Sequence, residues 1–306
     1  MKKYLLITCG ILFLLSACSK VPISGRKQLN LLPESQMMTM SLAAYTEFLD
    51  TSKVVNSGGD KQLVATTGQR ISNAVTSYLR KKKQLKRVKG FQWEFNLVDS
   101  PDANAWAMPG GKVVFYTGIL PITQDQNGLA VVMGHEVAHA IARHGNERMS
   151  QGLALNLGGL GLAVALSQKP AATQGLFLQA YGVGTSLGML KYSRKHESEA
   201  DKMGLVFMAM AGYDPNQAPE FWKRMSAMSE GQAPPEFIST HPSHETRIRE
   251  LNEFMPEAMK FYDSSNAAPN LKTKNDSKRK DSKQTKPGGT GNDKSKNTSG
   301  DPKRKN

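Results

Sequence analysis

The spacing of hydrophobic residues predicts a helix and two strands in the first half of the chain. Apolar residues recur at helical spacing across roughly 61–83, at Ile71, Ala74, Val75, Tyr78 and Leu79. From Phe91 to Leu97 apolar and polar residues alternate, which predicts a half-buried strand. A second β-rich run, Lys112 to Tyr116, follows the turn Met108-Pro109-Gly110-Gly111, so we expect the two strands to pair.

Two longer segments in the second half are predicted to be helical. Residues 126–144 form one helix, which Gly145 is expected to end, and the acidic segment from Ser193 is expected to stay helical to about Ala211. We find no internal repeat of useful period. The predicted elements indicate a mainly α protein with a small β-sheet, the α+β class.

The first residues follow the pattern of a bacterial export signal. Lys2 and Lys3 precede an apolar run, and the stretch Leu15-Ser16-Ala17-Cys18 resembles the lipobox, where the signal is cut before a cysteine that receives lipid. We therefore expect a signal peptide at 1–17, a lipidated Cys18 and a lipid-anchored tether at 18–35. Ser19 resembles an outer-membrane address; the alternative is a plain secreted protein with a chance cysteine at its cleavage site.

Positive charge is concentrated at the C-terminal end. The chain has 40 Lys and Arg residues against 26 Asp and Glu residues. Residues 264–306 alone contain 12 of the basic residues but only four of the acidic ones. Because the tail has only one leucine, we predict a folded domain at 36–262 and a disordered basic tail at 263–306. The tail either contacts anionic lipid or cell-wall polymer or is simply solvated. We expect no nucleic-acid partner, since the folded part is read as lacking a basic stripe.

The sequence His135-Glu136-Val137-Ala138-His139 places two histidines one helical turn apart on the same face. Both ring nitrogens can then reach one metal ion, and a pair of neutral imidazoles favours Zn²⁺, one per chain. Glu136 adjoins the first ligand and is positioned to take a proton from water at the metal. The alternative is a buried structural helix with incidental histidines.

A third ligand is expected because a catalytic zinc site normally uses three protein groups. The extended motif with a third histidine on the same segment is excluded, since Ala142 and Gly145 stand where it needs Gly and His. His144 is predicted to face away from the site at the helix C-terminus. The acidic stretch from Ser193 supplies three candidates, Glu197, Glu199 and Asp201. From the residues alone, either Glu197 or Glu199 could be the third ligand. The alternative is that these acidic residues form only a solvated helix face.

Four motifs in order give the chain a specific resemblance. They are His135-Glu136-x-x-His139, then Ser193-Arg194-x-x-Glu197-x-x-Ala200-Asp201, then His241-Pro242 before Arg247, and Val21-Pro22-Ile23-Ser24-Gly25-Arg26 at the mature N-terminus. Together they resemble the HtpX/CAAX-prenyl-protease family of zinc metallopeptidases, peptidase family M forty-eight, over roughly 21–255. The N-terminal motif and Asn104-Ala105-Trp106 resemble the soluble LoiP/BepA/OMA-like branch of that family.

The resemblance implies a gluzincin-type metallopeptidase domain with the HExxH on a central helix. Carried over position by position, it implies His135, His139 and Glu197 as metal ligands, Glu136 as catalytic base and Asp201 as the residue that orients a ligand. The apolar segments Leu153–Leu166 and Leu176–Leu190 depart from membrane-spanning members of the family. Both are shorter than about 20 residues, so we interpret them as packed helices covering the site.

The downstream histidine of the family falls on His241. We assign it a catalytic role as a second donor that stabilises the oxyanion formed when the peptide carbonyl is attacked. The alternative, suggested by the resemblance to BepA, is that His241 fills the open position of the metal and switches the enzyme off.

Substrates are expected to be peptides in extended form. An exposed edge at Gly111, Lys112, Val113 and Val114 would bind a substrate as an added strand, whereas the competing interpretation makes the same segment an internal strand. We expect an envelope location, lipid-anchored at the outer membrane and facing the periplasm. The expected function is then zinc-dependent cleavage of unfolded or misassembled envelope proteins. The alternatives are a chaperone-like client-binding lipoprotein and a cell-wall peptide hydrolase.

Overall fold

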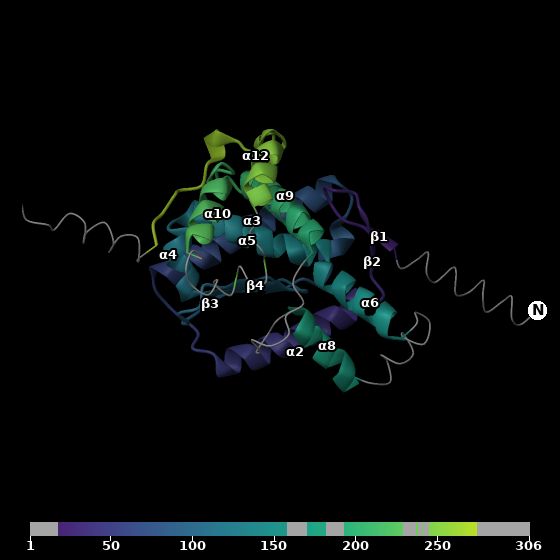
Figure 1. The fold of residues 1–306 in the computed structure, drawn as a ribbon. Helices are drawn as coiled ribbons and strands as arrows, with labels where there is room; N and C mark the ends of the chain where they lie inside the picture. The colour runs from purple at the N-terminus through teal and green to yellow at the C-terminus, as the bar shows by residue number, and fades with distance from the viewer. Residues whose placement is uncertain are drawn as a thin grey trace, which may run out of the picture.

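The computed structural model describes residues 18–157, 170–181, 193–228, 237, 241 and 245–273. Helices dominate these residues around one three-stranded sheet and a short two-stranded hairpin (Figure 1), which confirms the predicted α+β class. The two helices predicted around 61–83 and 193–211 are present as α3 (Gly59–Lys81) and α9 (Arg194–Met210). Ser193 caps α9 by accepting a hydrogen bond from the His196 amide at 3.2 Å.

The main sheet has the strand order β3-β5-β4, with β3 (Glu94–Val98), β4 (Ala105–Met108) and β5 (Lys112–Tyr116). The expected pairing of β3 with β5 is confirmed, and the two strands run parallel. Strand β4 was not predicted and runs antiparallel to β5. Strand β5 is hydrogen-bonded on both sides. The prediction of an exposed edge strand at Gly111, Lys112, Val113 and Val114 is therefore wrong, and the competing interpretation of an internal strand is confirmed. The outer strands are β3 and β4. Residues 53–55 hydrogen-bond to the outer side of β3, so the side left unpaired among the described residues is that of β4.

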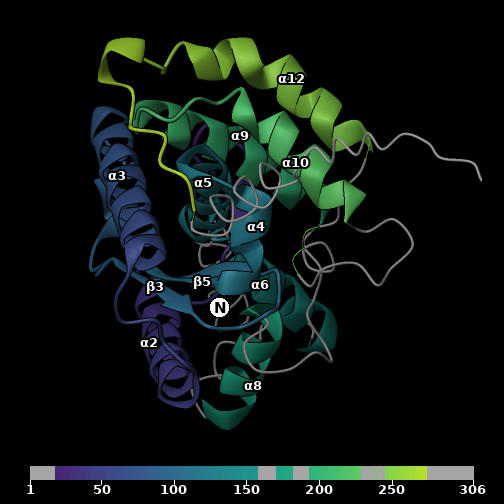
Figure 2. The same ribbon diagram turned by 90° about the vertical axis from the view of Figure 1, so that its left-hand side faces the viewer.

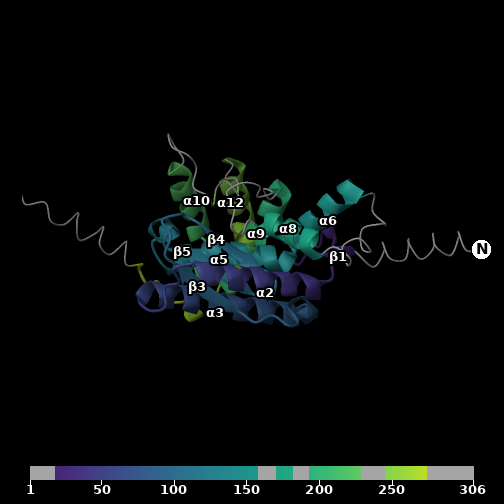
Figure 3. The ribbon, with the colours of Figure 1, turned by 90° about the horizontal axis from the view of Figure 1, so that it is seen from below.

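Helices cover both faces of this sheet (Figures 1 and 2). On one face α3, α5 (Gln126–Ala142) and α9 enclose the largest apolar core. On the other face α2 (Glu34–Thr51) places Tyr45 and Phe48 against Trp106 of β4, with α8 (Pro170–Tyr181) packed beside it (Figure 3). The helix that carries the paired histidines is therefore buried on all sides, as expected for a central helix.

Helices α5 and α9 cross at two glycines. A Cβ atom on Gly134 would lie 2.9 Å from the carbonyl oxygen of Gly204, so only hydrogen at these positions permits the close approach. This crossing sits one residue from His135 on one helix, and about one turn beyond Asp201 and two turns beyond Glu197 on the other. It brings the two segments with metal-ligating residue types together.

The end of α5 differs from the prediction. The helix stops at Ala142, Arg143 adopts the left-handed conformation with φ of 61°, and α6 (His144–Leu157) begins directly after it. Gly145 therefore lies inside the next helix rather than at the end of the first. Because the chain changes direction at Arg143, the position of His144 cannot be extrapolated from the geometry of α5.

Shorter elements complete the described chain. A helical layer over α5 and α9 consists of α10 (Gln217–Ala227) and α12 (Glu245–Met259). The remaining short helices are α4 (Leu120–Thr123), η1 (Leu85–Val88), η2 (Thr117–Ile119) and η3 (Ser264–Asn266). Of the apolar segments interpreted as covering helices, the described parts in α6 and α8 pack against each other and share an apolar cluster with α2. Residues 158–166 and 182–190 of these segments lie outside the described residues.

The segment predicted as a tether is packed onto the domain. Strand β1 (Cys18–Lys20) pairs antiparallel with β2 (Lys27–Leu29), and Val21 between them is 1% exposed. The buried Arg87 side chain donates hydrogen bonds to the carbonyl oxygens of Lys20 and Ile141. The folded domain therefore begins near residue 18, not at residue 36.

The C-terminal boundary also differs from the prediction. Residues 263–273, assigned to the disordered tail, run across the start of α5, where the Gln126 amide donates to the Leu271 carbonyl at 3.0 Å and the Thr273 amide to the Gln124 carbonyl at 3.0 Å. Lys272 and Asn270 also bond to Asp125, the N-cap residue of α5. Backbone pairing orders this segment despite its polar composition; residues 274–306 lie outside the described residues.

The folded part carries a basic surface that was not expected. No acidic residue occurs between Asp60 and Glu94, and the end of α3 with η1 exposes six cationic side chains, Arg80, Lys81, Lys82, Lys83, Lys86 and Lys89. Arg87 links this surface to β1 through its bond to Lys20. Among the described residues, no helix has both the length and the apolar composition that crossing a membrane requires.

Candidate metal centre

Four side chains meet where α5 crosses α9, and all four are buried. His135, His139, Glu197 and His241 each offer one ligand atom, and these atoms lie within 4.8 Å of one another. The Nε2 atoms of the two α5 histidines are 3.0 Å apart, as their one-turn spacing predicts. Glu197 completes the group, with carboxylate oxygens 3.4 Å from each of these Nε2 atoms.

The helix caps explain why these side chains converge. Asp125 accepts a hydrogen bond from the Gly128 amide and fixes the start of α5, while Ser193 fixes the start of α9. Glu197 therefore lies in the first turn of α9 and faces α5. Glu199, two residues further on, points to another side of the helix.

The donor set fits a divalent metal of the zinc type. Two imidazole nitrogens and a carboxylate converge in a buried space, which is the ligand chemistry of catalytic zinc sites. Burial alone would raise the pKa of Glu197, but the facing His241 and His135 rings hold it well below the usual range. Burial lowers the pKa of His139 well below its usual value, so its Nε2 is available as a ligand.

Glu136 lies beside the ligand cluster with an unused acceptor. Its Oε1 atom is buried and has no hydrogen-bond partner among the described residues. His241 Nε2 lies 3.5 Å from this Oε1 atom. Burial raises the pKa of Glu136. A buried carboxylate with a free oxygen and a raised pKa is suited to accept and return a proton.

His241 occupies the fourth position around the cluster. Its Nδ1 atom is 3.2 Å from His135 Nε2 and 3.1 Å from Glu197 Oε1. The ring stacks on Phe237 with centroids 4.7 Å apart, and the His241 amide donates to the Phe237 carbonyl at 2.8 Å. These two contacts with Phe237 hold the His241 ring against the ligand cluster.

Asp201 accepts a hydrogen bond from His135 Nδ1 at 2.9 Å, as expected for a residue that orients a ligand. Arg247 of α12 joins this pair, donating to Asp201 at 2.6 Å and to Glu197 at 3.1 Å. Its guanidinium lies 3.3 Å from the ring centroid of Trp222. Burial would raise the pKa of Asp201, but Arg247 and His135 lower it.

The sequence did not predict the positions of two residues near the site, Arg247 and His144. Arg247 was noted only as part of a motif, and nothing in its local sequence signals that it bridges two carboxylates. The prediction that His144 faces away is wrong: its Nδ1 lies 3.0 Å from His139 Nδ1 and the side chain is fully buried. Glu199 is not among the ligand atoms but contacts His144 Nε2 at 3.2 Å.

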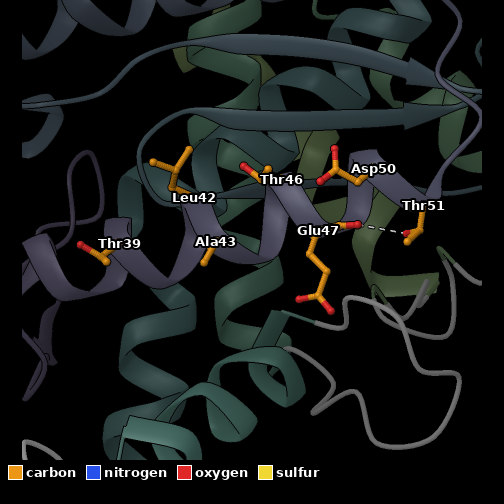
Figure 4. Close-up of a pocket in the computed structure, with 7 residues that line it drawn as sticks. All are labelled: Thr39, Leu42, Ala43, Thr46, Glu47, Asp50 and Thr51. Atoms are coloured by element: carbon orange, nitrogen blue, oxygen red, sulfur yellow. Dashed lines mark hydrogen bonds between the residues drawn. The ribbon is translucent and has the colours of Figure 1, made fainter.

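A surface pocket on α2 is a separate feature (Figure 4). It is lined by Thr39, Leu42, Ala43, Thr46, Glu47, Asp50 and Thr51. It contains two carboxylates and no histidine or cysteine, so it lacks the donor set of the cluster on α5 and α9. The chemistry of the described residues is therefore concentrated at the buried cluster.

The fold and this cluster define a metallopeptidase: paired histidines on a central helix, a carboxylate from the neighbouring helix, and a free glutamate beside them. Comparison with known proteins agrees, since residues 66–255 match the model of peptidase family M48. The chain belongs to this family and is a metalloprotease.

Several characterised members are similar over most of the chain. The mitochondrial metalloendopeptidase OMA1 of Schizosaccharomyces pombe is 35% identical over 83% of this chain and 71% of its own length. Metalloendopeptidase OMA1 of Homo sapiens is 31% identical over 81% of this chain and 48% of its own. The beta-barrel assembly-enhancing protease of Escherichia coli is 30% identical over 51% of this chain and 33% of its own. The chain thus spans about half or less of the length of the latter two relatives.

Proposed function

We propose that this protein is a zinc metalloendopeptidase, anchored to a membrane of the cell envelope, that hydrolyses peptide bonds of unfolded or misassembled envelope proteins. The observation that carries the proposal is the convergence of His135, His139 and Glu197 beside Glu136, whose buried Oε1 accepts no hydrogen bond from the described residues. The similarity to the beta-barrel assembly-enhancing protease of Escherichia coli supports substrates of the envelope class.

His135, His139 and Glu197 would hold the zinc ion. Asp201 orients His135, and Arg247 orients Glu197. When bound, zinc lowers the pKa of water and polarises a peptide carbonyl. Glu136 accepts the proton that the attacking water loses and then donates it to the leaving amine. Burial raises the pKa of Glu136, which makes its carboxylate a stronger base toward the attacking water.

His241 is proposed to control access to this centre. Its Nδ1 lies 3.1 Å from Glu197 and 3.2 Å from His135, within the space that a substrate carbonyl and water need. This position supports the interpretation in which His241 closes the site over the competing interpretation, in which it donates to the oxyanion. An enzyme closed in this way would turn over slowly until the His241 ring moves away from the ligands.

The substrate is proposed to bind along β4 instead of β5. The Tyr116 amide donates to the Asn104 carbonyl at 3.0 Å, so the alternation of an antiparallel pair directs the backbone groups of Trp106 and Met108 toward β5. The backbone groups of Ala107 then point to the outer side of the sheet, where an extended peptide can pair with them. Strand β4 packs against α5, which supports a bound peptide running past the HExxH residues.

The anchor is proposed at Cys18. Strand β1 starts at this residue, and the basic surface at Arg80 to Lys89 is joined to β1 through Arg87. Exposed lysines beside an acylated residue would meet anionic headgroups when the protein lies on the membrane. This arrangement supports attachment at the membrane surface without a spanning helix.

Digestion of unfolded casein by residues 19–273 tests the function, with peptides identified by mass spectrometry. Cleavage that is lost in Glu136→Gln and on chelation, and restored by zinc, is the expected result. Glu257→Gln serves as the matched control, because Glu257 is an exposed residue of α12 that pairs only with Lys260 in the described structure. A wild type that never cleaves, together with a Glu136→Gln protein that retains full function in the cell, would favour a client-binding role.

A further inference from the structure

A chain of buried polar contacts leads from the N-terminal segment to a metal ligand. We propose that Arg26 is a positioning residue for His139, acting through Glu199 and His144 to fix the orientation and tautomer of the ligand ring. None of these three residues has a role in the proposed mechanism. The inference rests on the metal centre of the proposed function but not on the identity of its substrate.

The first contact is between two imidazoles. His139 directs Nε2 to the ligand cluster, so its other nitrogen, Nδ1, carries the hydrogen and can donate. The acceptor is His144 Nδ1 at 3.0 Å. His144 must then carry its own hydrogen on Nε2, which lies 3.2 Å from Glu199 Oε2. One arrangement of hydrogens satisfies both contacts and leaves His139 Nε2 free to bind metal.

Glu199 is the acceptor that fixes this arrangement, and Arg26 fixes Glu199. Arg26 Nε donates to Oε1 at 2.7 Å and to Oε2 at 2.9 Å, and Nη2 donates to Oε2 at 2.7 Å. The Ser24 hydroxyl adds a bond to Oε1 at 2.7 Å. Three donor atoms therefore make four hydrogen bonds to one carboxylate. A charged acceptor also makes the His144 hydrogen bond stronger.

The other side of the guanidinium is held equally firmly. Arg26 Nη1 and Nη2 donate to the two oxygens of Glu147 at 2.6 and 2.7 Å. Glu147 Oε2 also contacts His196 Nε2 at 3.1 Å, and the His196 ring stacks on His144 with centroids 4.5 Å apart. Arg26 thus bridges α6 and α9 directly beneath the ring that contacts the metal ligand.

The turn that carries Arg26 is built to present it. The Val21 amide donates to the Arg26 carbonyl at 2.8 Å, and Gly25 has φ of 67°, a conformation that glycine adopts without strain. Val21 is buried in the main core at the other end of the turn. A planar fork is required to serve two carboxylates at once, so lysine cannot replace arginine here without loss.

The test measures metal affinity of the full chain, which does not depend on any substrate. Zinc dissociation constants are determined by competition with a chelator for the wild type, Arg26→Gln and Glu199→Gln, and the cobalt-substituted proteins are compared by their absorption spectra. Both variants are expected to bind zinc about 10-fold or more weakly and to change the cobalt spectrum. Arg26→Lys is expected to recover part of the affinity, and the double variant to be no weaker than the weaker single one.

Arg70→Gln is the matched control. Its guanidinium, on α3, is partly buried and donates to the Ala211 carbonyl at 3.2 Å, away from Glu199 and Glu147. It should lower the melting temperature of the metal-free protein and leave zinc affinity unchanged.

The proposal would be overturned if Arg26→Gln and Glu199→Gln bind zinc like the wild type and leave the cobalt spectrum unchanged. A lower melting temperature alone would make Arg26 a structural residue. Circular dichroism establishes that each variant is folded before binding is measured. A protein that binds zinc with the predicted variant effects but cleaves no peptide would refute the proposed function while supporting this inference.

Discussion

Gly134 and Gly204 face each other where α5 crosses α9, and a Cβ atom on Gly134 would meet the Gly204 carbonyl oxygen at 2.9 Å. Because the obstacle is backbone, Gly134→Ala must separate the helices and move His135 away from Glu197. We expect a loss of about 1–3 kcal/mol in the free energy of unfolding and a weaker zinc affinity. Denaturant melts and chelator competition measure the two. Gly152→Ala in α6 is the control: its Cβ meets nothing within 4 Å, so stability should rise slightly.

Arg247→Met tests the cation that joins Asp201 to Glu197. Removing it leaves two buried carboxylates without their shared partner, which is expected to cost about 3–5 kcal/mol in the metal-free protein. The cost should be smaller with zinc bound, because the ion supplies positive charge at the same place. Arg249→Met, on the same helix with a side chain 66% exposed, should change stability by less than about 0.5 kcal/mol. Equal losses in the two variants, measured by urea titration, would contradict this account.

His241→Ala separates the two roles of this residue. If His241 closes the centre, its removal should raise basal turnover of unfolded casein several-fold and leave zinc bound through His135, His139 and Glu197. If it stabilises the oxyanion, turnover should fall by about 10²-fold or more. Initial rates at saturating zinc decide between a gain and a loss.

Glu147 predicts an acid-dependent part of the stability. Burial would raise its pKa, but hydrogen bonds from Arg26 and His196 lower the pKa to about 2 in the folded protein. A carboxyl group whose folded pKa lies below its unfolded value of 4.5 contributes stability above pH 4.5, and this contribution is lost as the pH falls toward 2. We expect about 1–2 kcal/mol from this group.

Urea unfolding of the metal-free protein across that pH range measures this effect. Glu147→Gln should show a shallower loss of stability below pH 4.5 than the wild type. Glu253→Gln, which removes an exposed carboxylate of α12, should leave the slope as it is. Parallel slopes for the wild type and Glu147→Gln would exclude Glu147 as the source.

Cys18→Ala tests the anchor. The variant is expected to move from the membrane pellet to the soluble fraction after cell disruption. Residual binding to anionic vesicles should then depend on the basic surface and disappear when Lys82, Lys83 and Lys86 are changed to glutamate. Changing Lys223 and Lys260 in the same way is the control, because they lie on α10 and beyond α12. A Cys18→Ala protein that still pellets with membranes would contradict lipid anchoring.

Local patterns along the chain were sufficient for the elements that depend on neighbouring residues. The helical period at Ile71 to Leu79, the alternation before Leu97 and the one-turn spacing of His135 and His139 each predicted an element that the structure contains. Strand β4 escaped because four residues, Ala105 to Met108, are too short to show a period. The basic surface escaped because charge was summed over the whole folded part, not along α3.

The sequence by itself determined the class of chemistry, because HExxH on one helix is a short-range pattern with one geometry. Only the tertiary structure decided which partners complete it. Glu197 and Glu199 are indistinguishable along α9, and the crossing at Gly134 and Gly204 turns the first toward the ligands and the second toward Arg26. Likewise the left-handed turn at Arg143 sends His144 back to His139. Such contacts join residues more than 50 positions apart or depend on one backbone angle. A short-range pattern in the sequence predicts neither of these.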